Sequence, residues 1–276
     1  MAAKPHRFAT GFQFTEGPAF DREGNLFVVN VKGGYISKIT PRGRVSTFVN
    51  TGGAPNGAKF HANGHLFVCD CALRAILDVA PDGTFRKAVT EWNGSQLRGP
   101  NDLVFASNGS YYFTDPEGSS LENAIGAVYH VNADGKVERV TQGMAYPNGV
   151  VISADGRRLF VAETLTLRIH EFALQPSGMP AAGRIHAELQ PGGIGPDGMA
   201  FDVEGNLYVA YYGMGKVVVL DMWGTVIREL PAGGKNPTNL AFGGKERRYL
   251  YITETETNSV YVLKNDIPGT PLFGDV

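Results

Sequence analysis

Short apolar runs recur along the chain, and each follows a turn rich in Gly, Asn or Asp. A turn of this composition between two β-rich segments is typical of a β-hairpin. The apolar runs are residues 26–29 (LFVV), 66–68 (LFV), 111–113 (YYF), 159–161 (LFV), 207–210 (LYVA) and 249–252 (YLYI). An alternating third run follows several of them, such as 35–39 (YISKI) and 216–220 (KVVVL), and a fourth run follows a further turn. The pattern therefore predicts units of four antiparallel strands.

One short phrase precedes the first turn of every unit, and it opens with a residue that carries a side-chain oxygen. The opening residues are Glu16, Asn56, Asn101, Asn148, Asp197 and Thr238, at steps of 40, 45, 47, 49 and 41 residues. Periods of about 40–50 residues are typical of β-propellers, in which each repeat is one four-stranded blade. We therefore predict an all-β fold, a six-bladed β-propeller with four-stranded blades. Equivalent positions of the blades converge on the central channel, so these six oxygens are predicted to form a ring around the axis.

The last unit lacks a fourth strand, because only a short tail with two prolines follows residues 260–263 (VYVL). A segment at about residues 6–11, before the first phrase, is free to replace it. We expect this N-terminal strand to complete the last blade and close the ring, since an incomplete blade would expose a sheet edge. A frayed N-terminus is the alternative. Six continuous repeats predict that residues 1–276 form a single domain.

Composition limits the partners and the location. The formal net charge is −2, so neither a nucleic acid nor an anionic membrane surface is indicated as a partner. No apolar run reaches the roughly 18 residues of a membrane-spanning helix, and residues 1–7 lack the apolar core of a secretory signal. We expect a soluble, cytoplasmic protein that is a monomer or a weak homodimer. Cys69 and Cys71 face opposite sides of a strand, so they are expected to be reduced and buried.

The ring carries the candidate chemistry. Glu16 and Asp197 bring negative charge, and the other four residues bring neutral oxygens. Oxygen ligands suit hard cations, Ca²⁺ above all, with Mg²⁺ and Mn²⁺ as competitors, whereas a site that prefers Zn²⁺ would contain His or Cys. The alternative is turn chemistry, because Asn and Asp before Gly are frequent turn formers. Turn chemistry explains Glu16 poorly, and two carboxylates on one axis would repel each other without a cation or a proton between them.

Several motifs, in order, resemble the SMP-30/gluconolactonase (regucalcin-like) family. They are residues 15–18 (TEGP), 100–104 (PNDLV), 113–116 (FTDP), 146–149 (YPNG), 196–198 (PDG), 237–244 (PTNLAFGG) and 250–253 (LYIT). The resemblance runs from about Phe12 to Leu263. It implies a six-bladed propeller with one divalent cation on the axis, most often Ca²⁺, with Mg²⁺, Mn²⁺ or Zn²⁺ as other candidates. Members of this family commonly hydrolyse lactones of sugar acids.

The resemblance also assigns roles to individual residues. It implies that Glu16, Asn148 and Asp197 hold the metal and that Asn101 contacts the substrate or a water molecule. Asp197 is the implied general base, with Glu16 as a second choice. Asn101 and Asp197 are thus the candidate catalytic residues of a lactonase whose metal polarises the lactone carbonyl.

Two positions depart from the family pattern. Many sugar lactonases have an Arg where this chain has Gly99, with Arg98 one step earlier. Arg98, and Glu117 from a polar rim loop at residues 115–123, are therefore candidate substrate-binding residues beside Asn101. The expected substrate is a sugar-acid lactone or a related lactone. Either Arg98 takes the place of the missing Arg, or recognition of sugar hydroxyls is weakened and the substrate is a less hydroxylated or larger lactone. At residues 162–164 (AET) members often have Asp-Thr, so Glu163 is expected to be a solvated strand end or part of the channel lining.

Other functions remain open on the same scaffold. A metal-dependent phosphotriesterase, another enzyme acting on a related carbonyl compound, and a non-catalytic calcium-binding propeller are the alternatives. No Gly-X-Ser-X-Gly motif occurs, so a serine-hydrolase triad has no support. The histidines are expected to be solvated or satisfied by neighbours. Four tyrosines at or near strand ends could contribute to the wall of a substrate pocket: Tyr111, Tyr112, Tyr211 and Tyr212.

Overall fold

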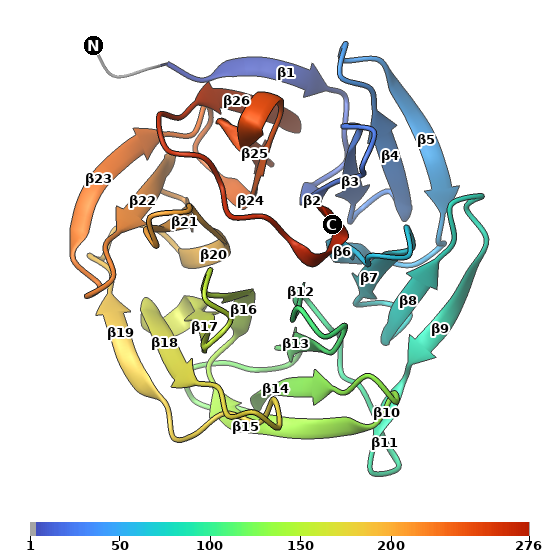
Figure 1. The fold of residues 1–276 in the computed structure, drawn as a ribbon, viewed down its shortest axis with the longest axis vertical. Helices are drawn as coiled ribbons and strands as arrows, with labels where there is room; N and C mark the ends of the chain where they lie inside the picture. The colour runs from blue at the N-terminus through green and yellow to red at the C-terminus, as the bar shows by residue number, and fades with distance from the viewer. Residues whose placement is uncertain (1–3, 276) are drawn as a thin grey trace.

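Six antiparallel sheets of four strands each surround a central axis (Figure 1), as the computed structural model of the chain shows for residues 4–275. The predicted six-bladed β-propeller is thus confirmed. Met1–Ala3, part of the segment considered above as a secretory signal, and Val276 lie outside the described residues. In each of the first five blades the chain runs from the axis outward, so that the first strand is innermost and the fourth forms the rim.

The first three blades contain β2 to β15. Blade 1 consists of β2 (Thr15–Phe20), β3 (Leu26–Asn30), β4 (Tyr35–Ile39) and β5 (Val45–Asn50). Blade 2 consists of β6 (Pro55–Phe60), β7 (Leu66–Asp70), β8 (Ala75–Val79) and β9 (Phe85–Val89). Blade 3 consists of β12 (Leu103–Phe105), β13 (Tyr111–Asp115), β14 (Gly126–Val131) and β15 (Val137–Met144). Between blades 2 and 3, β10 (Glu91–Trp92) and β11 (Ser95–Gln96) form an extra hairpin that the sequence pattern did not predict.

Blades 4 to 6 contain the remaining strands. Blade 4 consists of β16 (Pro147–Ile152), β17 (Arg158–Glu163), β18 (Arg168–Ala173) and β19 (Arg184–Glu188). Blade 5 consists of β20 (Gly195–Phe201), β21 (Leu207–Tyr212), β22 (Lys216–Leu220) and β23 (Val226–Pro231). Blade 6 consists of β24 (Pro237–Gly243), β25 (Tyr249–Glu254), β26 (Ser259–Lys264) and β1 (His6–Thr10). Three short 3₁₀ helices are η1 (Thr164–Thr166), η2 (Lys245–Arg247) and η3 (Phe273–Asp275). None of the helices in residues 4–275 has the length and apolar character needed to cross a membrane.

The N-terminal strand closes the propeller as predicted. β1 pairs antiparallel with β26, with His6 opposite Val262 and Thr10 opposite Ser259. The Ser259 hydroxyl also donates a hydrogen bond to the Thr10 hydroxyl at 2.9 Å. Blade 6 therefore combines the first strand of the chain with the last three, and the edge of β26 is covered.

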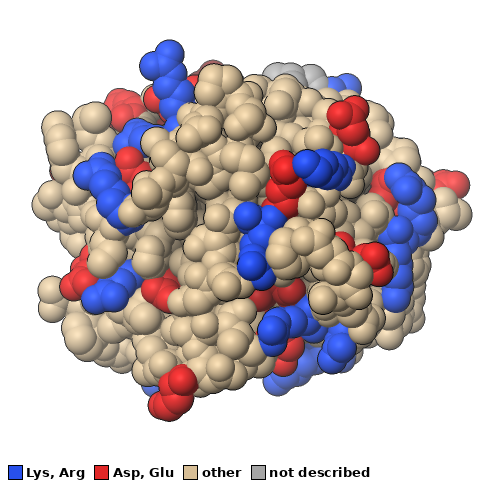
Figure 2. All heavy atoms as spheres, turned by 90° about the horizontal axis from the view of Figure 1, so that it is seen from below, with Lys and Arg blue, Asp and Glu red and all other residues tan. Residues whose placement is uncertain are grey.

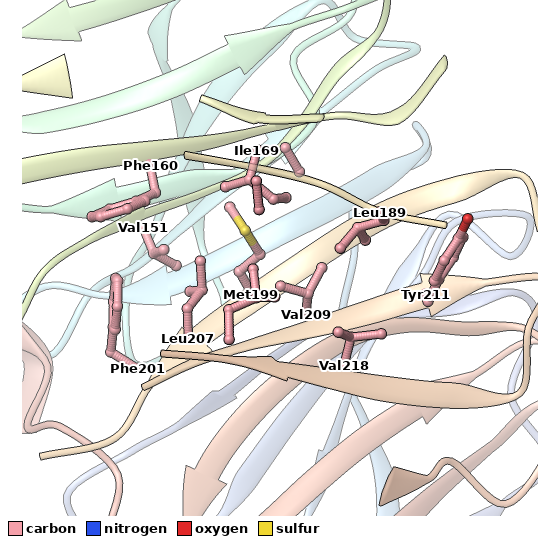
Figure 3. Packing of buried hydrophobic residues seen from close by; sticks show 13 residues of the cluster. Val151, Phe160, Ile169, Leu189, Met199, Phe201, Leu207, Val209, Tyr211 and Val218 are labelled. Carbon is pink, nitrogen blue, oxygen red and sulfur yellow. The ribbon is translucent and has the colours of Figure 1, made fainter. Parts of the chain in front are cut away.

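The core lies between neighbouring blades. Figure 3 shows one such layer, in which Val151 and Phe160 of blade 4 pack against Met199, Phe201 and Leu207 of blade 5. Because each blade has a neighbour on both faces, the second strand of a blade is buried on both sides. This explains why residues 26–29 or 207–210 form continuous apolar runs instead of alternating ones. Each fully buried side chain of this size contributes about 1.5–3 kcal/mol.

The C-terminal tail covers one mouth of the central channel. It crosses the axis after β26 and ends near β6 (Figure 1). The Thr270 N–H donates to the carbonyl of Phe201 at 2.9 Å, and Gly274 lies against Phe60. A cavity of about 320 Å³ lies under this tail, walled by the last residues of several innermost strands, such as Phe201 and Phe242. The ring residues lie at the other end of those strands.

The outer surface carries mixed charge. On the face seen in Figure 2, basic and acidic side chains are interspersed among neutral ones. Elsewhere in the molecule, charged side chains form ion pairs, such as Lys38 with Asp21 and Arg86 with Asp78. The face in view therefore has no large region of one sign, in keeping with the net charge of −2.

Candidate functional site

All six ring residues lie at the same end of the innermost strands. Five of the ring residues lie in the first half of an innermost strand: Glu16 in β2, Asn56 in β6, Asn148 in β16, Asp197 in β20 and Thr238 in β24. Asn101 lies two residues before β12. In the five blades where the ring residue is part of a strand, the pairing with the second strand shifts register next to it. Such bulges redirect side chains and are frequent at active sites. The ring residues therefore do not lie in hairpin turns, and the turn-chemistry alternative does not describe them.

The glycines that follow four ring residues let the innermost strands approach one another. A side chain at Gly149 would overlap the carbonyl of Asp197, and one at Gly198 would overlap Asn239. A side chain at Gly57 would overlap Asp102. Glycine is required here for close approach of backbones. The result is a narrow axis at which the innermost strands of neighbouring blades lie close together.

Glu16 and Asp197 are buried together on this axis, with exposures of 3% and 7%. Burial raises the pKa of Glu16 to about 7. The Gly17 N–H donates a hydrogen bond to Glu16 Oε2 at 2.7 Å and opposes this shift. The negative charge of Asp102 adds to the shift. Burial, followed by the charges of Glu16 and Asp102, raises the pKa of Asp197 well above its ordinary value. The three carboxylates therefore repel one another, and ionising all of them requires a compensating charge.

An unpartnered oxygen shows where such a charge would lie. Asp197 Oδ1 is buried and has no hydrogen-bond partner among residues 4–275, and the same is true of Asn56 Oδ1. A buried carboxylate oxygen without a partner is costly unless a cation or a ligand contacts it. The donor set fits a hard divalent cation, because carboxylate and amide oxygens are its preferred ligands.

Asn148 is oriented by its neighbours. Its amide nitrogen donates to the Thr164 hydroxyl at 3.2 Å, and that hydroxyl donates to the carbonyl of Pro196 at 2.8 Å. With the nitrogen engaged in this way, the amide oxygen of Asn148 is available as a ligand. Residues 4–275 contain no group of three or more His, Cys, Asp and Glu side chains placed to hold a metal ion. A cation bound by Glu16 and Asp197 would therefore need neutral oxygens such as that of Asn148.

The hydroxyl oxygen of Thr238 is less available to a cation than its place in the repeat predicted. Its hydroxyl lies 2.9 Å from the carbonyl of Thr15, to which it donates, and 2.8 Å from the hydroxyl of Thr253. These contacts hold blade 6 against blade 1. The Thr238 oxygen is therefore part of the scaffold of the ring.

Sequence reasoning missed a buried ion pair beside the site. The Lys59 ammonium lies 3.8 Å from Asp102 Oδ1, and both side chains are at least nine-tenths buried. The charges of Glu16, Asp197, Asp102 and Lys59 add up to −2 when all are ionised, which one divalent cation would neutralise. A departure from the repeat marks Asp102: glycine follows Glu16, Asn56, Asn148 and Asp197, whereas Asp102 follows Asn101. Asn239 is the corresponding departure in blade 6.

The rim above Asn101 contains Gly99, the position at which the sequence departs from the expected Arg. A Cβ atom on Gly99 would lie 2.8 Å from the Cβ of Glu117, so Glu117 fills the space that a longer residue 99 would need. The N–H groups of Gly99 and Arg98 donate to Asp115 at 2.6 and 3.0 Å. The Arg98 side chain is exposed. Burial raises the pKa of Asp115 and that of Tyr129, and the charge of Arg98 opposes both shifts.

A repeated anchor holds the segment that precedes a ring residue. In five blades, an acid or Asn at the end of the second strand accepts a hydrogen bond from a backbone N–H two or three residues before the ring residue. The pairs are Asn30 with Gln13, Asp70 with Ala54, Asp115 with Gly99, Glu163 with Ala145 and Glu254 with Asn236. Each bond connects the segment that leads to the ring residue with the second strand of a blade.

Glu163 was wrongly expected to be a solvated strand end or part of the channel lining. It is buried, and it accepts hydrogen bonds from the Ala145 N–H and the Thr166 hydroxyl, both at 2.6 Å, and lies 2.8 Å from His170 Nε2. Burial alone would raise its pKa, but the bonds from His170, Thr166 and Ala145 outweigh burial and lower it. The longer side chain of Glu therefore serves to reach the segment that leads to Asn148.

We expect Glu163→Ala to lower the free energy of unfolding by about 2–3 kcal/mol, because the buried N–H of Ala145 would lose its acceptor. For a chain of this size that corresponds to a fall in Tm of roughly 4–12 °C. Calorimetry would measure the change, with Glu188→Ala as a control because Glu188 is exposed on β19. A Tm equal to that of the control would contradict the anchoring role.

The cysteines are free, as predicted. Cys69 is buried, whereas Cys71 is half-buried on the site side of blade 2, where its thiol donates to the carbonyl of Pro100 at 3.2 Å. Burial raises the pKa of Cys71 to about 12, so its thiol is protonated at neutral pH.

Comparisons with known proteins agree with this geometry. Residues 14–256 match the SMP-30/Gluconolactonase/LRE-like region. Lactonase drp35 of Staphylococcus haemolyticus is 35% identical over 266 residues, which cover 91% of this chain and 78% of that protein. Lactonase drp35 of Staphylococcus aureus is 33% identical over 265 residues, with the same coverage.

Solved structures share the fold. A gluconolactonase of Xanthomonas campestris has a TM-score of 0.85 at 27% identity, covering 96% of this chain and 90% of that chain. A regucalcin of Agrobacterium tumefaciens has a TM-score of 0.86 at 20% identity, covering 99% and 98%. The family match spans most of the chain and confirms the resemblance seen in the motifs. This chain belongs to the SMP-30/gluconolactonase family.

Proposed function

We propose that this protein is a divalent-cation-dependent lactonase whose active centre is the axial site formed by Glu16, Asn148 and Asp197. The observation that carries the proposal is the pair of buried, mutually repelling carboxylates, one of which has an oxygen without a partner. Membership of the family, and relatives named lactonase and gluconolactonase, support lactone hydrolysis as the reaction. Ca²⁺ is the first candidate cation, with Mg²⁺, Mn²⁺ and Zn²⁺ to be tested beside it.

The cation, held by Glu16, Asn148 and Asp197, would polarise the lactone carbonyl as a Lewis acid. The protein's own groups then handle the water and its proton. Asp197 accepts a proton from the attacking water as the water oxygen bonds to the carbonyl carbon. The ring C–O bond breaks, its electron pair goes to the ring oxygen, and Asp197 returns the proton there. One water is consumed and one hydroxy acid is formed.

Asp197 is a better candidate for the base than Glu16. Glu16 Oε2 already accepts a hydrogen bond from Gly17 at 2.7 Å, whereas Asp197 Oδ1 is unpartnered. In the metal-free protein, burial and the neighbouring carboxylates raise the pKa of Asp197, but a bound cation would lower it again. The choice between the two carboxylates therefore rests on the unpartnered oxygen of Asp197. The amides of Asn101 and Asn148 would orient the water and the developing oxyanion.

The rim favours lactones with fewer hydroxyl groups than a sugar lactone. Gly99 offers no side chain to bind hydroxyls, and Glu117 occupies the adjacent space.

A panel of aldonolactones and simple γ- and δ-lactones, assayed with a pH indicator in the presence of Ca²⁺, tests both the lactonase activity and this preference. Turnover of simple lactones above that of aldonolactones is expected. The lactonase proposal would fail if none of the panel were hydrolysed while the protein bound the cation, a result that favours a different reaction or a non-catalytic propeller.

We expect Asn101→Ala to lower kcat by about 10²-fold while the cation affinity changes less than about threefold, because Asn101 acts on the water or the substrate. Asn123→Ala, in the exposed rim loop, is the matched control. Steady-state kinetics and a calorimetric Ca²⁺ titration on both variants would measure the two effects. A loss of cation affinity as large as the loss of kcat would instead make Asn101 a metal ligand.

A further inference from the structure

Two positions of the innermost strands carry a charge where the other blades carry none. One residue after the ring residue, four blades have glycine, whereas blade 3 has Asp102 and blade 6 has Asn239. Three residues after the ring residue, blade 2 has Lys59. The other five blades have a small apolar residue there, namely Ala19, Val104, Val151, Ala200 and Ala241. Lys59 and Asp102 are thus the two charged departures from the repeat at these positions.

The two departures form one buried unit. The Lys59 ammonium lies 3.8 Å from Asp102 Oδ1, and the two side chains are 9% and 2% exposed. The ammonium also donates to the carbonyl of Ala58 at 3.2 Å, and Asp102 Oδ1 accepts from the Leu103 N–H at 2.9 Å. Among residues 4–275, Lys59 is the only buried lysine or arginine. Because a buried charge without a partner is costly, each of these two residues accounts for the other.

The pair lies next to the ring, where three innermost strands are in close contact. A Cβ atom on Gly57 would lie 2.3 Å from Asp102 Oδ1, and the Gly57 N–H donates to the carbonyl of Asn101 at 2.6 Å. A Cβ atom on Gly17, whose N–H holds Glu16, would lie 2.2 Å from the carbonyl of Asn56. The backbones of blades 1, 2 and 3 therefore bring the pair close to Glu16. In keeping with this, burial has the largest effect on the pKa of Glu16, and the charges of Asp102 and Lys59 act on it in opposite directions.

The Lys59 side chain extends along the channel toward the ring. Lys59 lies in the wall of the cavity under the C-terminal tail, together with Val104 and Ala241, which have the same place in their repeats. Its ammonium lies at Asp102, which is only one residue beyond the ring residue of blade 3. A positive charge is thus fixed on the tail side of the ring.

We propose that Lys59 is a specificity-determining residue for the cation, because its ammonium sets the charge that the axial site presents. The inference rests on the proposed function, in which Glu16 and Asp197 hold a divalent cation. Lys59 neutralises Asp102, so the charges of the two ligand carboxylates remain, and together they match a divalent ion. Without Lys59 the same groups would carry a charge of −3, and cations would be bound more tightly, trivalent ions most of all.

The test changes one charge at a time. In Lys59→Met we expect the affinity for Ca²⁺ to rise by about tenfold and that for Tb³⁺ by about 30-fold, because the Coulomb energy scales with the charge of the cation. Asp102→Asn, which leaves a charge of −1, should lower the Ca²⁺ affinity by about tenfold. The double variant Lys59→Met/Asp102→Asn restores −2 and should lie within about threefold of wild type. Lys87→Met is the matched control, since Lys87 is exposed on β9 of the same blade.

Calorimetric titrations at pH 7 on chelator-treated protein would measure these affinities. Equal Ca²⁺ affinities, within about twofold, in wild type, Lys59→Met and Asp102→Asn would overturn the proposal, because the three sites differ in charge. If Lys59→Met does not fold, Asp102→Asn and the double variant decide: equal affinities overturn the proposal, and a double variant that binds about tenfold more tightly than Asp102→Asn supports it.

Lactone turnover of wild type, measured separately, distinguishes this inference from the proposed function. If the affinities follow the charges but no lactone is hydrolysed with any cation, the lactonase proposal is wrong and the role of Lys59 stands. If wild type binds no cation, both proposals are overturned.

Discussion

Asp197→Asn is expected to abolish lactone turnover, with a fall in kcat of at least about 10³-fold at saturating metal. The amide cannot accept the proton of the attacking water, and it also removes one of the two negative ligands. The fold should persist, because asparagine has the same shape and no charge. Without metal, the variant should even be more stable than wild type, since burial and the repulsion from Glu16 and Asp102 disfavour an ionised Asp197.

Steady-state kinetics over a range of Mn²⁺ concentrations would measure the loss, and calorimetry in a chelator would measure the stability. Asp134→Asn is the matched control, because Asp134 is exposed in a hairpin turn of blade 3. Near-normal turnover of Asp197→Asn at saturating metal would show that Asp197 is not the base.

The second large effect is on the metal-free protein, whose stability should fall as the pH rises from about 5 to 8. The pKa of Glu16 is raised from 4.5 to about 7 in the fold, so the folded state holds this proton more tightly than the unfolded chain. The associated stability is fully present below pH 4.5 and is lost as the pH rises through 7. A pKa difference of this size corresponds to roughly 3 kcal/mol, or about 6–12 °C in Tm. Asp197 acts in the same direction.

Bound Ca²⁺ should remove this loss, because it compensates the ionised carboxylates. Melting curves at several pH values, with a chelator and with Ca²⁺, would show the two trends. In Glu16→Gln the decline in the chelator should be smaller, since one of the two titrating groups is absent. A Tm that rises with pH in the chelator, or that Ca²⁺ leaves unchanged at pH 8, would contradict the electrostatics of the axial site.

The sequence predicts the architecture well because blades depend on local patterns. Turns rich in Gly and Asn, continuous apolar second strands and a period of about 40–50 residues are all visible in one chain. The closing strand can be predicted by counting the strands of each repeat. The last repeat lacks a fourth strand, and the N-terminal segment before the first repeat belongs to no other blade. The extra hairpin of β10 and β11 has its own signal, the Asn93-Gly94 pair, whose positive φ angles are those of a two-residue hairpin turn.

The site is harder to predict from the sequence, because its hydrogen bonds and ion pairs join residues that are far apart along the chain. The repeat predicts six equivalent oxygens, yet Thr238 uses its hydroxyl for Thr15 and Thr253. The pairing of Lys59 with Asp102 joins residues from two blades, and no spacing along the chain reveals it. Departures from the repeat, such as Asp102 in place of glycine, were the available signal.

One measurement tests the central claim most directly: bound Mn²⁺ and lactone turnover, determined in the same samples as metal is titrated into chelator-treated protein. Electron paramagnetic resonance gives the bound Mn²⁺, and a pH-indicator assay gives the rate. We predict one tightly bound Mn²⁺ per chain, turnover in proportion to its occupancy, and loss of both in Glu16→Gln. Full turnover in the stripped protein, or a bound Mn²⁺ that leaves the rate unchanged, would contradict a catalytic cation at Glu16, Asn148 and Asp197.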